Sequence, residues 1–143
     1  MKFTTTSGKL AFIISLLSFF FLFSSCAQKN SFLHSSVVPG ADGGVNVSKD
    51  HNNNRVVKVH ITNLADPSRL NPARKEYVVW MVTDNATKNI GRIESSRSFF
   101  SKRLTGELET ITTFKPTKIF ITAEDDADIQ YPQGQEVLTT TDF

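Results

Sequence analysis

Apolar side chains at every second position constrain the fold of this chain more than any other feature. In Arg55–Leu64 (RVVKVHITNL), Val57, Val59 and Ile61 alternate with polar side chains. A period of two with β-branched residues predicts a strand that buries one face. Residues 45–49 show the same alternation, and the turn-forming stretch 50–54 (DHNNN) separates the two. We therefore predict a hairpin that joins 45–49 to 55–63.

A second kind of strand is predicted at 77–82 (YVVWMV), where six apolar residues follow one another. Such a run is typical of a central strand that is buried on both faces. Tyr77 and Trp80 are three positions apart, so their side chains should point to opposite faces. Gly91 interrupts the next apolar stretch and indicates a bulge or close packing.

Further strands are expected at 99–108, as an edge strand, at 118–123 and at 135–141, with Pro-containing turns before the last two. No stretch beyond residue 26 shows a helical period of 3.6. About seven short strands between residues 45 and 143 predict an all-β domain, a small antiparallel β-sandwich of the immunoglobulin-like kind.

The first 25 residues have the features of a signal peptide. Lys2 and Lys9 precede a fourteen-residue apolar stretch (LAFIISLLSFFFLF), and small residues follow it. The stretch is shorter than the ~20 residues of a stable membrane span, so an uncleaved anchor is the lesser alternative.

Phe23-Ser24-Ser25-Cys26 resembles the lipobox of bacterial lipoproteins. The resemblance implies cleavage before Cys26, a diacylglyceryl group on its thiol and an acyl chain such as palmitate on its new amino group. Two or more chains hold a protein firmly on a membrane. The alternative is a chance cysteine in an ordinary signal peptide.

Residues 26–44 are rich in Ser, Gly, Asn and Pro, which predicts a flexible tether between the lipid and a domain at 45–143. Phe32-Leu33 or Val37-Val38 could dock on that domain. Ala27 follows the cysteine, and a non-acidic residue there resembles lipoproteins directed to the outer membrane. The expected location is the bacterial cell envelope, on the extracytoplasmic side.

Net charge argues against a nucleic-acid partner. The whole chain carries 16 basic and 14 acidic residues, and two of the basic ones lie in the leader, so the mature chain is neutral. Its charge is uneven, with net +5 in 69–103 and net −6 in 107–143. Either the two segments cancel on the surface, or they form a dipolar surface that steers a charged partner. The candidate basic residues for a partner are Arg92, Arg97, Lys102 and Arg103.

No local motif predicts catalysis or a cofactor. His34, His51 and His60 are scattered, and neither a nucleophile elbow nor a phosphate loop is present. The sharpest polar cluster contains four acids, which are weak candidates for a calcium site: Glu124, Asp125, Asp126 and Asp128. These carboxylates lack the spacing of an EF-hand, and a solvated loop is the simpler interpretation.

The order of motifs in 56–138 resembles the extracytoplasmic domain of anti-sigma-K factors. That family shows Tyr-x-x-Trp, then a Gly, then Val-Thr-x-Glu and a Pro eight residues later. The corresponding residues here are Tyr77, Trp80, Gly91, Glu124 and Pro132. The family's Gly-Gly is replaced here by Ala127-Asp128, and the leader precludes its cytosolic segment. The resemblance implies a fold and a sensory or interaction role, not inhibition of a sigma factor.

From these observations we expect a lipid-anchored envelope lipoprotein that is a non-enzymatic interaction or sensory module, with an envelope protein as its partner. A lipoprotein that binds a small ligand or calcium is the alternative. An envelope hydrolase is third, and would need a deep pocket that gathers His60 with an acid and a serine.

Overall fold

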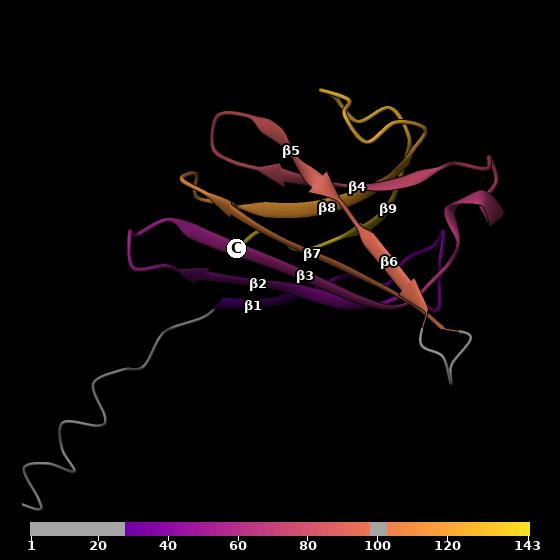
Figure 1. Cartoon of the computed structure of the whole chain (residues 1–143), viewed down its shortest axis with the longest axis horizontal. Coiled ribbons are helices and arrows are strands. Elements are labelled where there is room, and N and C mark those ends of the chain that lie inside the picture. The colour runs from indigo at the N-terminus through magenta and orange to yellow at the C-terminus, as the bar shows by residue number, and fades with distance from the viewer. Residues whose placement is uncertain (1–27, 98–102) are drawn as a thin grey trace, which may run out of the picture.

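The computed structural model describes residues 28–97 and 103–143, which form nine strands in two antiparallel sheets (Figure 1). None of these residues belongs to a helix that could cross a membrane. The strands are β1 Gln28–Ser31, β2 Asp42–Lys49, β3 Arg55–Leu64, β4 Glu76–Val82, β5 Thr87–Arg92, β6 Glu94–Arg97, β7 Leu104–Thr112, β8 Lys118–Glu124 and β9 Gln135–Thr139. The predicted β-sandwich is confirmed. The predicted signal peptide and Cys26 lie outside the described residues.

The order of strands agrees with an immunoglobulin-like sandwich. One sheet has the order β1-β2-β3-β7-β6 and the other β5-β4-β8-β9. Without β1 these are the A-B-E-D and C′-C-F-G orders of that architecture. β1 is an additional strand on the free edge of β2.

The predicted hairpin is confirmed, and the structure gives its register. Val45 pairs with Val59 and Val47 with Val57, and these side chains are buried between the sheets. The turn is held by Asp50, whose carboxylate accepts hydrogen bonds from the backbone N–H groups of Asn52 and Asn54, both at 2.8 Å. Such side-chain bonds are the reason that Asp and Asn favour turns.

β4 is the central strand that its composition predicts. It lies between β5 and β8, and its five middle residues are buried. Gly91 pairs with Val79 at a register shift, and its φ of +131° is a conformation that favours glycine. A Cβ on Gly91 would lie 3.1 Å from Leu108 Cδ1, so the predicted bulge also brings the two sheets close together.

The prediction of a flexible tether is wrong for residues 28–44. β1 pairs with β2, and the chain then crosses to the other sheet, where Phe32 bridges Thr140 and the Leu33 N–H donates to the Thr139 carbonyl at 2.8 Å. Phe32 and Val38 are buried in the core. This segment closes one open side of the sandwich, so the folded domain includes residue 28.

The edge strand expected at 99–108 also differs from the structure. Residues 98–102 lie outside the described residues, and the strand begins at Leu104. β7 is an inner strand between β3 and β6, and the edge is the short, fully exposed β6. Four polar, exposed residues have no apolar alternation, so the sequence did not indicate this strand.

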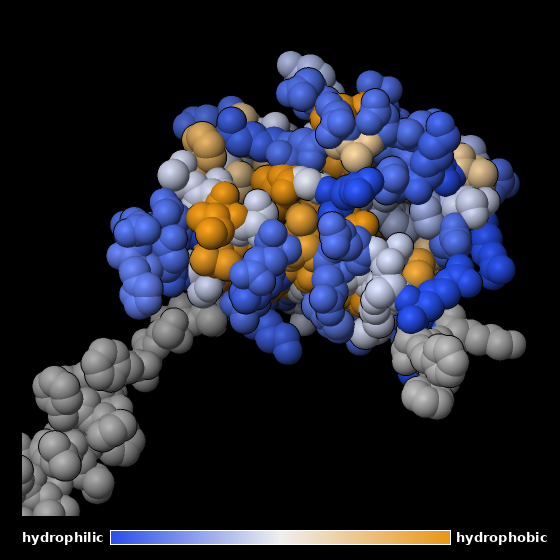
Figure 2. All heavy atoms as spheres, viewed as in Figure 1, coloured by the Kyte–Doolittle hydropathy of each residue, from blue (hydrophilic) through white to orange (hydrophobic). Residues whose placement is uncertain are grey.

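Figure 2 shows that hydrophilic residues cover most of this face of the molecule. Hydrophobic residues gather on its left side, close to the C-terminus and the β7–β8 turn seen in Figure 1.

Ser35 provides a test of the corrected domain boundary. Its buried hydroxyl donates to the Val137 carbonyl at 2.5 Å and accepts from the Val38 N–H at 2.9 Å. Ser35→Ala leaves both groups without this partner, so we expect a loss of about 1–3 kcal/mol in the free energy of unfolding. Chemical denaturation measures it, with the exposed neighbour Ser36→Ala as control. If the two variants were equally stable, the result would contradict a folded segment at residues 28–44 and favour a flexible tether there.

Candidate functional site

The outer face of the β5-β4-β8-β9 sheet holds a long connection in place through side-chain hydrogen bonds. Tyr77 packs between the sheets and Trp80 on the outer face, as their spacing predicts, yet Trp80 is completely buried. Its ring stacks on that of Phe120, with 6.3 Å between centroids. The β8–β9 connection, residues 125–134, lies above this face in Figure 1.

A buried chain of hydrogen bonds anchors this connection. Trp80 Nε1–H donates to Thr122 Oγ1 at 2.8 Å, and the Thr122 hydroxyl donates to Glu124 Oε1 at 2.6 Å. The same carboxylate oxygen accepts from the Gln133 N–H at 3.0 Å. Glu124 is only 1 % exposed. Because buried polar groups need partners, this chain fixes the end of the loop against the sheet.

Gly134 permits the close approach. A Cβ at this position would lie 1.7 Å from the Ala123 carbonyl oxygen and 2.9 Å from Glu124 Oε2. Any other residue would push the loop away from the strand.

Asn89 on β5 holds the middle of the loop. Its Nδ2 donates to the carbonyls of Ala127 and Ile129, at 2.8 and 2.9 Å. Its Oδ1 accepts from the Gly91 N–H at 2.9 Å. One amide therefore joins the loop to the bulge of β5.

Between β5 and the fixed loop runs an open groove of about 840 Å³. Its polar and aromatic walls come from Lys88, Arg92, Asp128, Gln130 and Tyr131. Tyr131 is 77 % exposed. This groove was not predicted from the sequence, since Asn89 and Tyr131 occur in turn-like stretches without a motif.

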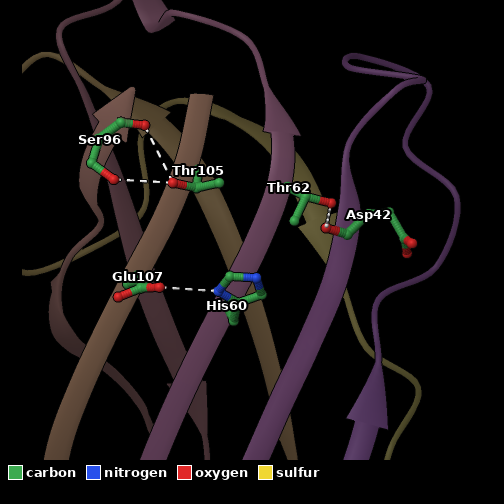
Figure 3. Close-up of polar contacts among 6 residues, drawn as sticks. All are labelled: Asp42, His60, Thr62, Ser96, Thr105 and Glu107. Atoms are coloured by element: carbon green, nitrogen blue, oxygen red, sulfur yellow. Dashed lines mark hydrogen bonds and ion pairs between the residues drawn. The ribbon is translucent and has the colours of Figure 1, made fainter. Parts of the chain in front are cut away.

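The outer face of the other sheet carries paired polar side chains (Figure 3). His60 Nδ1 lies 3.2 Å from Glu107 Oε1, and Ser96 Oγ lies 3.0 Å from Thr105 Oγ1. The three residue types of the hydrolase hypothesis thus share one face and line one open hollow of about 680 Å³. The Ser96 hydroxyl, however, contacts Thr105 on the neighbouring strand, while His60 is turned toward Glu107. Both contacts are cross-strand pairs, which stabilise neighbouring strands of a sheet.

The acidic candidates do not converge. Glu124 is buried under the loop, Asp125 pairs with Arg74 at 2.6 Å, and Asp126 accepts from the Asp128 N–H at 3.0 Å. In the described ranges, no group of three His, Cys, Asp or Glu residues is placed to hold a metal ion.

The basic candidates are partly neutralised by acids close to them in the fold. Arg92 Nη1 lies 3.7 Å from Glu76 Oε1, and Arg97 Nη2 lies 3.1 Å from Asp66 Oδ2. Lys102 lies outside the described residues, and Arg103 directly precedes β7. These pairs favour local cancellation of charge over a strong basic patch.

Two pKa values are shifted near the Arg97 pair. Hydrogen bonds from the Ser68 hydroxyl and N–H lower the pKa of Asp66, and Arg97 adds to the effect. Burial raises the pKa of Tyr77 to about 12, and the negative charge of Asp66 adds to this. The Tyr77 hydroxyl donates to the Ala65 carbonyl at 3.0 Å. Both groups stabilise the connection between β3 and β4.

Removal of the Asn89 amide should release the loop without unfolding the sandwich. In Asn89→Ala the loop loses two hydrogen bonds, so we expect its amide protons, Gln133 included, to exchange about ten to a hundred times faster. Core amides of β4 should keep their rates. Hydrogen exchange followed by NMR measures both, and Asn85→Ala in the exposed β4–β5 turn is the control. Unchanged loop rates would show that Glu124 alone holds the loop.

Comparisons with known proteins add no relative. No family model, no curated protein and no solved structure matches this chain. The residues that carry the resemblance to anti-sigma-K factors lie on β4, β5, β8 and the β8–β9 loop. That resemblance, like the lipobox, stays a prediction from the sequence.

Proposed function

We propose that the protein is a lipid-anchored lipoprotein of the bacterial cell envelope and acts there as a non-enzymatic interaction module. The observation that carries the proposal is the groove beside β5, whose loop is fixed at two points. Cys26 would bear the lipid, and an envelope protein would occupy the groove.

A fixed loop is suited to binding because little conformational freedom is lost when a partner arrives. Glu124 holds one end of the loop and Asn89 its middle. The exposed side chain of Tyr131 supplies a large amphipathic contact, the kind of residue that dominates binding energy in many interfaces. Lys88, Arg92 and Asp128 supply charges of both signs, which favours a specific polypeptide over a uniformly charged polymer.

A small ligand in the same groove is the second candidate. The groove volume of about 840 Å³ lies within the roughly 300–1,000 Å³ that is usual for small-molecule sites, which supports this alternative. The groove is open and carries charged side chains of both signs, which favours a polypeptide.

Site-specific crosslinking tests the binding surface. A photoreactive residue at Gln130, in cells, should give one discrete protein adduct, and the same residue at Thr62 on the opposite sheet should not. Tyr131→Ala should lower the adduct yield by at least about tenfold, since loss of an aromatic anchor costs ~2 kcal/mol or more. Leu33→Ala, another exposed side chain, is the matched control. Equal adducts from both faces, or none from position 130, would contradict a protein partner in the groove.

The anchor has its own test. Cys26→Ser removes the thiol that would carry the diacylglyceryl group, so the variant should appear as an unprocessed precursor or leave the membrane fraction. Mass spectrometry and fractionation distinguish the two outcomes. A variant with unchanged mass and membrane attachment would exclude the lipoprotein assignment.

A further inference from the structure

One end of the sandwich lies next to the position of the proposed lipid. β1 begins at Gln28, which pairs with Val47; Val47 pairs with Val57, and Val57 with Thr110. The β2–β3 turn, the end of β7 and the β7–β8 turn therefore lie at the same end as the start of β1. Figure 1 shows this end on the left, where β1 begins.

The distance to the membrane is short. Cys26 precedes Gln28 by two residues. Two residues span at most roughly 7 Å, so an acylated Cys26 would hold this end of the domain at the lipid headgroups. A long tether would allow the domain to turn freely, but the pairing of β1 removes most of it.

The same end exposes apolar side chains. Ile111 at the end of β7 is 63 % exposed, and Phe114 in the following turn is 48 % exposed. The Thr112 hydroxyl accepts from the Phe114 N–H at 3.2 Å, which shapes this turn. Figure 2 shows hydrophobic residues gathered toward this side of the molecule.

One cation contacts these apolar residues, and others lie at the same end of the domain. Lys88 Nζ lies 4.4 Å from the centre of the Phe114 ring, an arrangement that keeps the ammonium beside the aromatic face. The other basic residues in the strands and turns of this end are Lys49, Arg55, Lys115 and Lys118. Its acidic side chains are those of Asp50, Asp84 and Asp142, so the side chains of this end have an excess of two positive charges. Apolar residues flanked by Lys and Arg are typical of surfaces that lie in the headgroup region of anionic membranes.

We propose that this end of the domain contacts the lipid surface, with Phe114 and Ile111 in the boundary between headgroups and acyl chains. The occupant is the membrane that carries the Cys26 lipid, so this inference rests on the anchor proposed above. It adds a fixed orientation, in which the loop at residues 65–75, at the opposite end, points away from the bilayer.

Depth measurements on the full lipidated protein test the orientation. Once Cys26 is acylated, an introduced cysteine is the only free thiol of the chain. Phe114→Cys carries an environment-sensitive fluorophore, and Ala73→Cys, an exposed position of the opposite loop, is the matched control. Vesicles of phosphatidylethanolamine and phosphatidylglycerol are the probe. Buried Trp80 reports that both variants are folded.

We expect aqueous iodide to quench the label at position 114 at least about fivefold less than the label at 73, because residues in the headgroup boundary are shielded from water. Lipid-borne nitroxide should quench in the reverse order. If the protein floats with the vesicles but both labels are equally open to iodide, the orientation is wrong while the anchor stands. If the protein does not float, the anchor itself fails, and the orientation with it.

Discussion

The burial of β4 on both faces is the constraint on which the rest of the structure depends. The facing sheet covers its inner face, but the outer face, with Trp80, needs a second cover. The β8–β9 loop provides that cover, and the Glu124 carboxylate joins loop and sheet by accepting from both Thr122 and Gln133. A buried carboxylate is costly unless its lone pairs are used. The same bonds that satisfy Glu124 therefore fix the loop, and the groove beside β5 is a consequence of how the core is closed.

Much of the fold follows from local patterns. The alternation in β2 and β3 predicted that they form a hairpin, and the apolar run of β4 indicated a central strand. The edges were not predictable in this way. β1 pairs on one side only and β6 is exposed throughout, so neither needs alternating apolar residues, and the Ser- and Gly-rich composition before residue 45 concealed a folded segment. The Ser35 hydroxyl donates to the carbonyl of Val137, about a hundred residues away. No local sequence pattern indicates such a contact.

The site was less predictable than the fold. Glu124 stands beside Asp125 and Asp126, so composition groups it with solvated acids, yet the end of β8 points it under the loop. Asn89 is an ordinary turn residue by sequence and becomes a support only because two carbonyls of the loop meet its amide. The uneven charge along the sequence also did not predict how charges lie on the surface. Arg92 and Arg97 from the basic segment pair with Glu76 and Asp66, acids that lie near them only in the fold.

Lys88 joins the two proposed surfaces. It lines the groove and lies over the ring of Phe114 at the end where β1 begins. The groove follows β5, whose first residues are at that end and whose last residue, Arg92, is at the other. A partner in the groove of a domain oriented as we propose would therefore extend along the domain toward the bilayer. Such a path suits a partner protein that is attached to the same membrane. Anchoring both molecules in one plane raises their effective concentration, so a modest interface is sufficient for binding.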